Sequence, residues 1–323
     1  MLKVGILGAG GIAIKMATTL AGMETAQAYA IAARDEARAQ AFAREYGFEK
    51  AYGSYEALLA DPQVQLVYIA LPHSHHYRYA TLALEAGKHV LCEKAFTVNA
   101  DQARRLCALA KEKKLLITEA IWTRYMPSRK MIDDIVASGV IGEVTSLTAN
   151  LGYELAHVKR IWDVNLAGGA LLDVGVYVIN FARMVFGEDM TDVTAVADFK
   201  NGVDAIDSIT MTFAGGRVAT TQASVRAALN RRGCVFGTKG YIEVQNINNP
   251  EKIRVYDMDH REIAAYDPPK QITGYEYEVE ACARAIASGA LECPEMPHAE
   301  TIRVMEIMDG IRASWGYDIP LLD

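Results

Sequence analysis

The sequence predicts two folds in series: an α/β domain with a doubly wound parallel sheet, then an α+β domain with a large, predominantly antiparallel open sheet. From residue 1 to about 120, short apolar runs alternate with stretches of helical periodicity, which is typical of βαβ units. From Val144 onward, longer β-branched runs follow one another with turn signals between them, which is typical of antiparallel strands. The length of 323 residues suits two domains. We therefore predict one domain over residues 1–120 and a second over residues 121–323.

The expected strands of the first domain are almost continuously apolar, as they are when helices cover both faces of a parallel sheet. They lie at residues 3–7, 28–32, 66–70, 88–92 and 115–119. Helical periodicity is found at residues 35–46, 75–87 and 99–113. In the second domain, strands are expected at 144–153, 193–200, 205–214, 217–227, 241–245 and 252–257, and helices at 127–138, 169–186, 275–288 and 298–313.

A glycine-rich turn, G-x-G-x-x-A, follows the first expected strand and opens a helix. Gly8 permits a tight turn, and Gly10 lets the backbone approach a pyrophosphate. The small side chain of Ala13 lets the helix pack closely, with the N–H groups of its first turn, which contains Gly11 and Ile12, directed at the phosphates. We therefore predict that this turn binds a dinucleotide in a Rossmann domain. A merely tight structural turn is the alternative.

The end of the second strand bears on which dinucleotide binds. A site for NAD usually has an acidic residue there, about 20 residues after the glycines, that holds the ribose hydroxyls. Here the position is Ala33, followed by Arg34, with Arg38 one helical turn later. Guanidinium groups beside the ribose suit a 2′-phosphate. We therefore favour NADP. Asp35 keeps NAD open, and a solvated charge cluster at a helix start is the alternative without a ligand.

Three histidines lie within four residues directly after the strand at 66–70. A metal site at this spacing normally draws Cys or carboxylate ligands at recognisable intervals. We find no such set and predict no metal site. We expect Ser74 to cap the following helix. Because the carboxyl ends of parallel strands line the ligand crevice, Leu71, His73 and His76 are candidate cofactor contacts.

Glu93 and Lys94 follow the strand at 88–92, at the same edge of the expected sheet. One interpretation is a surface ion pair. The other is that Lys94 faces a bound ligand. Residues at this edge have a raised chance of being functional, so Glu93 and Lys94 are both candidate cofactor contacts.

The segment 166–187 is a long apolar helix opened by two glycines. It carries Asp173 and Tyr177, whose spacing of four residues puts them on one helical face. A carboxylate in so apolar a helix is costly unless it is paired. Either Asp173 satisfies buried backbone donors and Tyr177 is a core residue, or the two form a polar pair directed at the cofactor crevice.

The composition excludes several classes of protein. A formal net charge of −7 argues against a nucleic-acid partner. Five scattered cysteines without a Cys-x-x-Cys motif suit reduced thiols in a cytoplasmic protein. No apolar run approaches the ~18 residues that cross a bilayer, and closely set glycines argue against an N-terminal signal peptide. Strands that alternate Thr or Ser with apolar residues leave one sheet face open, and we expect a homodimer or higher homo-oligomer through it.

Five segments are recognisable together and in this order: "GILGAGGIA", "ALPHSHH", "VLCEKAFTVNA", "EAIWTRYMP" and "GGALLDVGVY". On these segments the chain resembles, over essentially its full length, the NAD(P)-dependent family of glucose–fructose oxidoreductase and inositol dehydrogenase (Gfo/Idh/MocA). Within the family, "AARDEARAQAFA", "AYGSYEALLADP", "EAIWTRY" and Tyr177 are most similar to the dimeric dihydrodiol dehydrogenases and the NADP-dependent D-xylose dehydrogenases. The resemblance implies hydride transfer between nicotinamide and a hydroxyl carbon of a sugar, polyol or cyclic trans-diol.

The resemblance also implies catalytic roles. Lys94 matches the lysine of the family's Glu-Lys-Pro motif, beside the nicotinamide and the reacting hydroxyl. Tyr177 matches the acid/base, and Asp173 matches its acidic partner one turn earlier. A free tyrosine has a pKa of ~10, which is high for a base at neutral pH, and a nearby ammonium would favour the phenolate. Ala95 replaces the family's proline, so the Lys94–Ala95 bond is either cis, as the Lys–Pro bond often is, or the loop follows another path.

Other matched residues belong to the binding site. His76 matches a histidine near the cofactor, and Trp122 and Arg124 match residues at the interdomain crevice, where Trp122 would also meet substrate. Tyr153 is a candidate substrate contact in a segment that could equally be a solvent-facing loop.

Two other functions stay open. One is a closed hydride shuttle with a tightly held cofactor, acting between an aldose and a ketose or in a redox-assisted elimination. The other is a non-catalytic NAD(P)-sensing regulator on the same scaffold, which would need neither Lys94 nor Tyr177.

Overall fold

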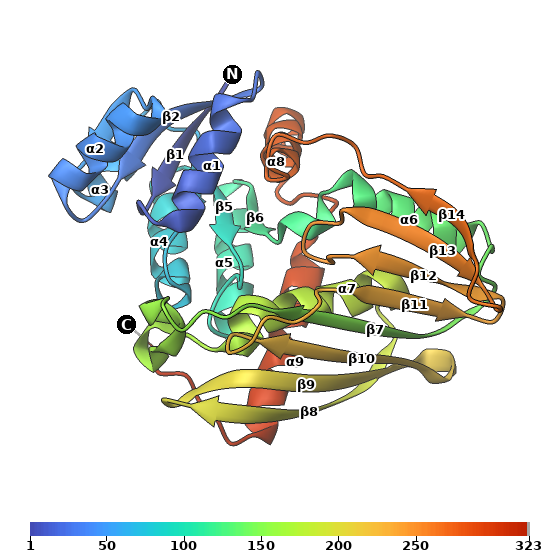
Figure 1. Cartoon of the computed structure of the whole chain (residues 1–323). Coiled ribbons are helices and arrows are strands. Elements are labelled where there is room, and N and C mark those ends of the chain that lie inside the picture. The colour runs from blue at the N-terminus through green and yellow to red at the C-terminus, as the bar shows by residue number, and fades with distance from the viewer. Residues whose placement is uncertain (322–323) are drawn as a thin grey trace. The chain divides into compact units, whose positions relative to one another are not determined.

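The structure is a computed structural model, described here for residues 1–321 (Figure 1). The chain forms two compact units. Among the described residues, the first unit comprises residues 1–125, 271–305 and 321, and the second comprises residues 126–270 and 306–320. The predicted second domain, 121–323, therefore differs from the second unit chiefly in residues 271–305, which pack within the first unit. The division falls inside helix α9 (His298–Ser314).

The first unit is built on a six-stranded sheet in the order β3-β2-β1-β4-β5-β6, and all neighbouring strands are parallel. The strands are β1 (Leu2–Leu7), β2 (Ala26–Ala32), β3 (Lys50–Tyr52), β4 (Leu66–Ile69), β5 (His89–Glu93) and β6 (Ile117–Ala120). Every residue of β4 and β6 is buried, as expected for a sheet covered on both faces. The predicted doubly wound parallel sheet is confirmed.

The helices of the first unit begin where the sequence supplies caps. The side chains of Asp35, Ser54 and Asn99 accept N–H groups at the starts of α2, α3 and α5. The predicted cap Ser74 is wrong, because α4 already begins at His73, one residue after Pro72, and Ser74 lies inside its first turn. The helices are α1 (Gly11–Ala21), α2 (Glu36–Tyr46), α3 (Tyr55–Leu59), α4 (His73–Glu85), α5 (Ala100–Lys113), the short 3₁₀ helix η1 (Trp122–Arg124) and α8 (Glu276–Ser288).

The second unit is built on an eight-stranded sheet in the order β14-β13-β12-β11-β7-β10-β9-β8. Only the β7–β10 pair is parallel, so the predicted, predominantly antiparallel sheet is confirmed. The strands are β7 (Val144–Gly152), β8 (Met190–Lys200), β9 (Val203–Phe213), β10 (Arg217–Ser224), β11 (Gly233–Gly237), β12 (Gly240–Gln245), β13 (Lys252–Asp257) and β14 (Glu262–Tyr266).

One face of this sheet carries the long apolar helix expected from the sequence. Helix α7 (Val176–Phe186) packs against β7 and β10. It is preceded by a π-helical turn, η4 (Leu171–Gly175). The remaining helices are α6 (Pro127–Ala137) and the 3₁₀ turns η2 (Lys159–Trp162), η3 (Val164–Leu166) and η5 (Ala214–Gly216). On β9, Ile209, Met211 and Phe213 are buried while the threonines between them are not, so the other face is open.

The expectation that no apolar segment approaches membrane-spanning length is wrong for the segment Val164–Phe186. It is long and apolar enough to cross a membrane by length and composition, with a mean hydropathy of 1.5. However, 89% of the 18-residue stretch that meets this criterion is buried inside the protein, which is typical of a core helix.

Candidate active site

The glycine-rich turn joins β1 to α1 and leaves room for a phosphate group. Gly8 has φ +101°, and a Cβ there would lie 2.6 Å from the carbonyl oxygen of Ala70, so only glycine fits. A Cβ added at Gly10 or Gly11 would meet nothing within 4 Å, so the start of α1 is open. Ala13 is fully buried, which lets α1 pack closely. These residues fit a dinucleotide pyrophosphate.

Arginines gather beside this turn. Arg38 donates from its guanidinium to the carbonyl oxygen of Ala9 at 2.7 Å, which fixes α2 next to the glycine turn. The carboxylate of Asp35 accepts the backbone N–H of Arg38 at 2.7 Å, so the acidic residue of this segment caps α2. Burial lowers the pKa of His75, and the positive charges of Arg34 and Arg78 lower it further. Arg34 and Arg78 are therefore close enough to His75 for their charges to act on it.

The three histidines have different neighbours. His76 is fully buried, and its Nδ1 and Nε2 lie 2.8 Å from the carbonyl oxygens of Ala95 and Leu71. His73 meets the ring of His76 edge-on, with centroids 5.7 Å apart. His75 stacks on Tyr79. No group of three metal-ligating side chains gathers in residues 1–321. His76 instead ties the end of β4 to the loop after β5.

That loop begins with Glu93 and Lys94. Glu93 is 5% exposed, accepts the Lys94 backbone N–H at 3.2 Å and accepts a short hydrogen bond from the hydroxyl of Tyr68. Because Glu93 lies below the surface, its burial argues against a surface ion pair. Lys94 itself is half-buried. The Lys94–Ala95 peptide bond is cis, which answers the question raised by the missing proline.

Trp122 and Arg124 lie in η1 and are held by the returning segment of the first unit. The indole of Trp122 stacks on the ring of Tyr275, with centroids 4.2 Å apart and an interplanar angle of 6°. Arg124 forms an ion pair with Glu300 at 2.5 Å, and both side chains are largely buried. Both residues are therefore packed against the segment 271–305 of the first unit.

Asp173 and Tyr177 lie in the second unit. Asp173 is 5% exposed, and its Oδ1 accepts from the guanidinium of Arg160 at 3.0 Å. One partner of Asp173 is therefore a charged side chain. Asp173 belongs to the π-helical turn, so the spacing to Tyr177 is not that of a regular α-helix. Tyr177, in the first turn of α7, is 7% exposed. Such π-helical turns are frequent at functional sites.

Tyr153 follows β7 and is half-buried. Its hydroxyl accepts from the side-chain amide of Asn248 at 3.0 Å, and the guanidinium of Arg231 lies 5.9 Å from its ring centroid. The ring is therefore held by neighbours within the second unit.

Comparisons with known proteins agree with this geometry. A family model described as an oxidoreductase family with an NAD-binding Rossmann fold matches residues 2–120, and a GFO/IDH/MocA C-terminal domain matches residues 130–243. The mouse trans-1,2-dihydrobenzene-1,2-diol dehydrogenase is 34% identical over 331 residues, covering 99% of this chain and 98% of that protein. This chain belongs to the GFO/IDH/MocA family.

Solved structures of relatives show the same fold. A 3-ketoreductase from Actinomadura kijaniata, in complex with NADP and TDP-benzene, superposes with a TM-score of 0.90 and is 28% identical, covering 97% of each chain. A levoglucosan dehydrogenase in complex with NADH has a TM-score of 0.86 at 23% identity, covering 99% of this chain and all of that one. The predicted family is confirmed, and this GFO/IDH/MocA member is an NAD(P)-dependent oxidoreductase.

Sequence reasoning missed two buried glutamates in the first unit. Glu119, at the end of β6, accepts the Phe96 N–H at 3.1 Å, and burial raises its pKa to about 7. Glu278, on α8, is fully buried with no hydrogen-bond partner for its carboxyl oxygens among the described residues. Burial, and then the charge of Glu93, raise the pKa of Glu278 well above its usual value. A glutamate inside the apolar run "LLITEA" was the available signal for Glu119.

Proposed function

We propose that this enzyme uses NADP in preference to NAD and transfers hydride to or from a hydroxyl carbon of a sugar, polyol or cyclic trans-diol. One observation carries the proposal. Two buried side chains, Glu93 and His76, form hydrogen bonds to the backbone of the Lys94–Ala95 loop, and this loop lies at the same edge of the sheet as the open glycine turn. The carboxyl ends of parallel strands are where ligands of such sheets bind. The similarity to trans-1,2-dihydrobenzene-1,2-diol dehydrogenases over nearly the whole chain supports the substrate class.

The proposed roles follow from the chemistry of alcohol oxidation. The nicotinamide, when the cofactor is bound, supplies the hydride chemistry. Tyr177 accepts the hydroxyl proton at its phenolic oxygen in oxidation and returns it in reduction. The Lys94 ammonium favours the phenolate and polarises the reacting oxygen. Asp173, paired with Arg160, holds the turn before Tyr177.

The binding residues are proposed from their places in the two units. The open turn at Gly8, Gly10, Gly11, Ile12 and Ala13 holds the pyrophosphate, and Leu71, His73, His76, Glu93 and Arg124 complete the cofactor site. Arg34 and Arg38 contact the 2′-phosphate, because guanidinium groups suit phosphate geometry and the carboxylate of Asp35 is engaged as a helix cap. Trp122 and Tyr153, both held rigidly by aromatic or hydrogen-bond partners, contact the substrate.

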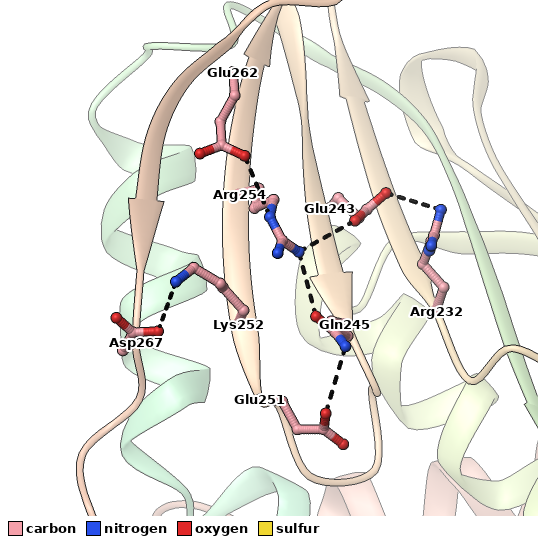
Figure 2. A network of polar contacts seen from close by, with 8 residues as sticks. All are labelled: Arg232, Glu243, Gln245, Glu251, Lys252, Arg254, Glu262 and Asp267. Atoms are coloured by element: carbon pink, nitrogen blue, oxygen red, sulfur yellow. Dashed lines mark hydrogen bonds and ion pairs between the residues drawn. The ribbon is translucent and has the colours of Figure 1, made fainter.

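We also propose a homodimer, or a higher homo-oligomer, that forms through the open face of the second sheet in the cytoplasm. Figure 2 shows that the charges on the β12–β14 side of this sheet pair with one another. Glu243 joins Arg232 at 3.0 Å and Arg254 at 3.7 Å, and Arg254 reaches Glu262 at 3.2 Å. A surface that neutralises its own charges can be covered by a second copy without leaving unpaired ions. All five cysteines are free thiols, as suits a reducing compartment.

The test is formation of NADPH, followed in the near ultraviolet, with aldoses, polyols and cyclic trans-diols, and with NAD run in parallel. We expect turnover with NADP that falls at least about a hundredfold in Tyr177→Phe and in Lys94→Ala, since a positioned acid/base contributes ~10²–10⁴-fold. Full turnover in Tyr177→Phe would overturn its proposed role. Cofactor that binds but neither exchanges nor turns over would point to the closed hydride shuttle or the sensor.

A further inference from the structure

The second unit contains two buried aspartates that the proposed mechanism does not use. Asp204 and Asp207 lie near the start of β9 and are 2% and 0% exposed. Residues three apart in a regular strand face opposite sides of the sheet. Here Ala205 is inserted as a β-bulge without a partner on β8. The extra residue directs both carboxyl groups to the buried side of the sheet.

Asp204 binds the start of the segment that leads to α7. Its Oδ2 accepts the backbone N–H of Leu171, the first residue of the π-helical turn, at 2.5 Å. Gly169, with φ +111°, makes room for this carboxyl group, because a Cβ there would lie 2.2 Å from Oδ1 of Asp204. The bulge in β9 and the glycine before the turn therefore bring the carboxylate of Asp204 within hydrogen-bonding distance of the Leu171 N–H.

Asp207 lies beside the other end of the same turn. A Cβ added at Gly175 would be 3.7 Å from Oδ2 of Asp207, which is ordinary van der Waals contact. Gly175 is the residue midway between Asp173 and Tyr177. The two aspartates therefore lie beside the two ends of the turn that contains Asp173 and leads to Tyr177.

Asp207 is buried without a hydrogen-bond partner, because neither of its carboxyl oxygens has one within the described part of the chain. A buried carboxyl group in this state favours its protonated form, since the charged form loses its hydration. Burial, and then the charge of Asp204, raise the pKa of Asp207 well above its usual value. The other charged or titratable groups that face the pair are Arg312, which lowers the pKa of Asp204, and Tyr317, whose own pKa burial raises to about 12.

We propose that Asp204 and Asp207 act as a positioning pair: sharing one proton, they fix the π-helical turn and thereby the orientation of Asp173 and Tyr177. The inference rests on the proposed function, since it assigns the pair a purpose only if Tyr177 is the acid/base. The positioning pair also makes the activity of the enzyme depend on pH. When the shared proton is lost, two adjacent buried carboxylates repel each other and the turn loses its fixed register.

The first test is Asp204→Ala, with the exposed Asp192→Ala on β8 as the matched control. Activity is normalised to NADPH-binding sites, so that unfolded protein is not counted. We expect kcat to fall about tenfold or more in Asp204→Ala, since small misplacements of a catalytic group are costly, while the Kd for NADPH stays within about twofold of the wild type. The control should behave as the wild type. A folded Asp204→Ala enzyme with unchanged kcat overturns the proposal.

The second test, which also decides the matter if Asp204→Ala does not fold, is the pH profile of Asp207→Asn. The asparagine amide donates to Asp204 at every pH. In carbonyl reduction, the wild type needs both the Tyr177 proton and the shared proton, so its log kcat should fall more steeply at alkaline pH than that of Asp207→Asn. Superimposable profiles overturn the proposal.

Tyr177→Phe, run alongside, separates the two possible failures. If Tyr177→Phe retains full turnover, the proposed acid/base fails. If it collapses while both aspartate variants behave as the wild type, only the positioning pair fails.

Discussion

At the scale of single residues, the first unit holds a carboxyl group whose protonation changes near neutral pH. Glu119 is 1% exposed, and burial raises its pKa to about 7 from an ordinary value of 4.5. Because the native state binds this proton more tightly than the unfolded chain does, the contribution to stability is fully present below pH 4.5. It is lost as the pH rises through 7. The carboxylate then stays buried against the Phe96 N–H, in the loop that follows Lys94.

We expect Glu119→Gln to remove this pH dependence, because the amide is neutral throughout and its oxygen still accepts from Phe96. The free energy of unfolding of the wild type should decline relative to that of Glu119→Gln by on the order of 3 kcal/mol between about pH 4.5 and 8. Urea unfolding across this range measures the difference. The exposed Glu112→Gln is the control, and a constant difference between wild type and Glu119→Gln would contradict the assignment.

A second prediction at this scale concerns cofactor choice. Arg34→Ala should weaken NADPH binding about 10- to 100-fold, because a hydrogen bond to a charged group is worth about 1.5–3 kcal/mol. NADH lacks the 2′-phosphate, so its Kd should change less than about threefold. Fluorescence titration measures both constants. Arg44→Ala, an exposed arginine in the last turn of α2, the helix that follows Arg34, is the matched control. Equal losses for NADPH and NADH would contradict the role of Arg34.

At the scale of elements, two glycine substitutions in the strand–turn–helix unit β1–α1 should distinguish an effect on stability from an effect on dinucleotide binding. Gly8→Ala puts a Cβ 2.6 Å from a backbone oxygen at φ +101°, and should cost about 2–4 kcal/mol of stability. Gly10→Ala meets no protein atom within 4 Å, and should fold normally. Both variants should lose dinucleotide binding, because a methyl group at position 10 occupies the space of the pyrophosphate. Thermal unfolding and NADPH titration give the two readouts, and normal NADPH binding by Gly10→Ala would contradict the predicted contact.

The helices and strands differ in how well the sequence predicts them. Long elements with a clear period, such as the buried strands of the first unit and α7, were predicted because burial imposes their pattern. The three-residue strand β3 and the short helix α3 were missed because segments this short cannot show a hydrophobic periodicity. Strands β11, bounded by glycines, and β14, largely exposed, lack the apolar alternation that marks a strand.

The site was harder to predict than the fold, because its details depend on backbone irregularities. The π-helical turn at Asp173 and the bulge at Ala205 each insert or displace a single residue. An inserted residue leaves hydrophobic periodicity almost unchanged, although it reverses where the next side chains point. Glu93, Lys94 and Asp173 could be picked out from unusual charge in apolar surroundings, whereas the partners of Glu93 and Asp173, Tyr68 and Arg160, come from distant segments.

At the scale of the whole molecule, the open face of the second sheet has a regular composition. Four threonines lie side by side on four neighbouring strands: Thr148 on β7 pairs with Thr220 on β10, Thr220 with Thr210 on β9, and Thr210 with Thr194 on β8. The row continues through Cys234 and ends in the charge network of Figure 2. Small β-branched side chains make this part of the sheet flat and uncharged, so an identical sheet can pack on it closely.

We therefore expect Thr220→Arg to convert the proposed dimer into monomers. In a twofold-symmetric interface every substitution occurs twice, so a guanidinium at the centre of the face would be buried opposite its own copy without a counter-ion. Thr18→Arg is the matched control, since Thr18 is an exposed threonine on α1 of the first unit and lies outside this sheet. Size-exclusion chromatography with light scattering gives the mass directly. A wild type that elutes as a monomer, or a dimer that survives Thr220→Arg, would show that this face is not the interface. If the dimer dissociates and turnover persists, the active site is complete within one chain.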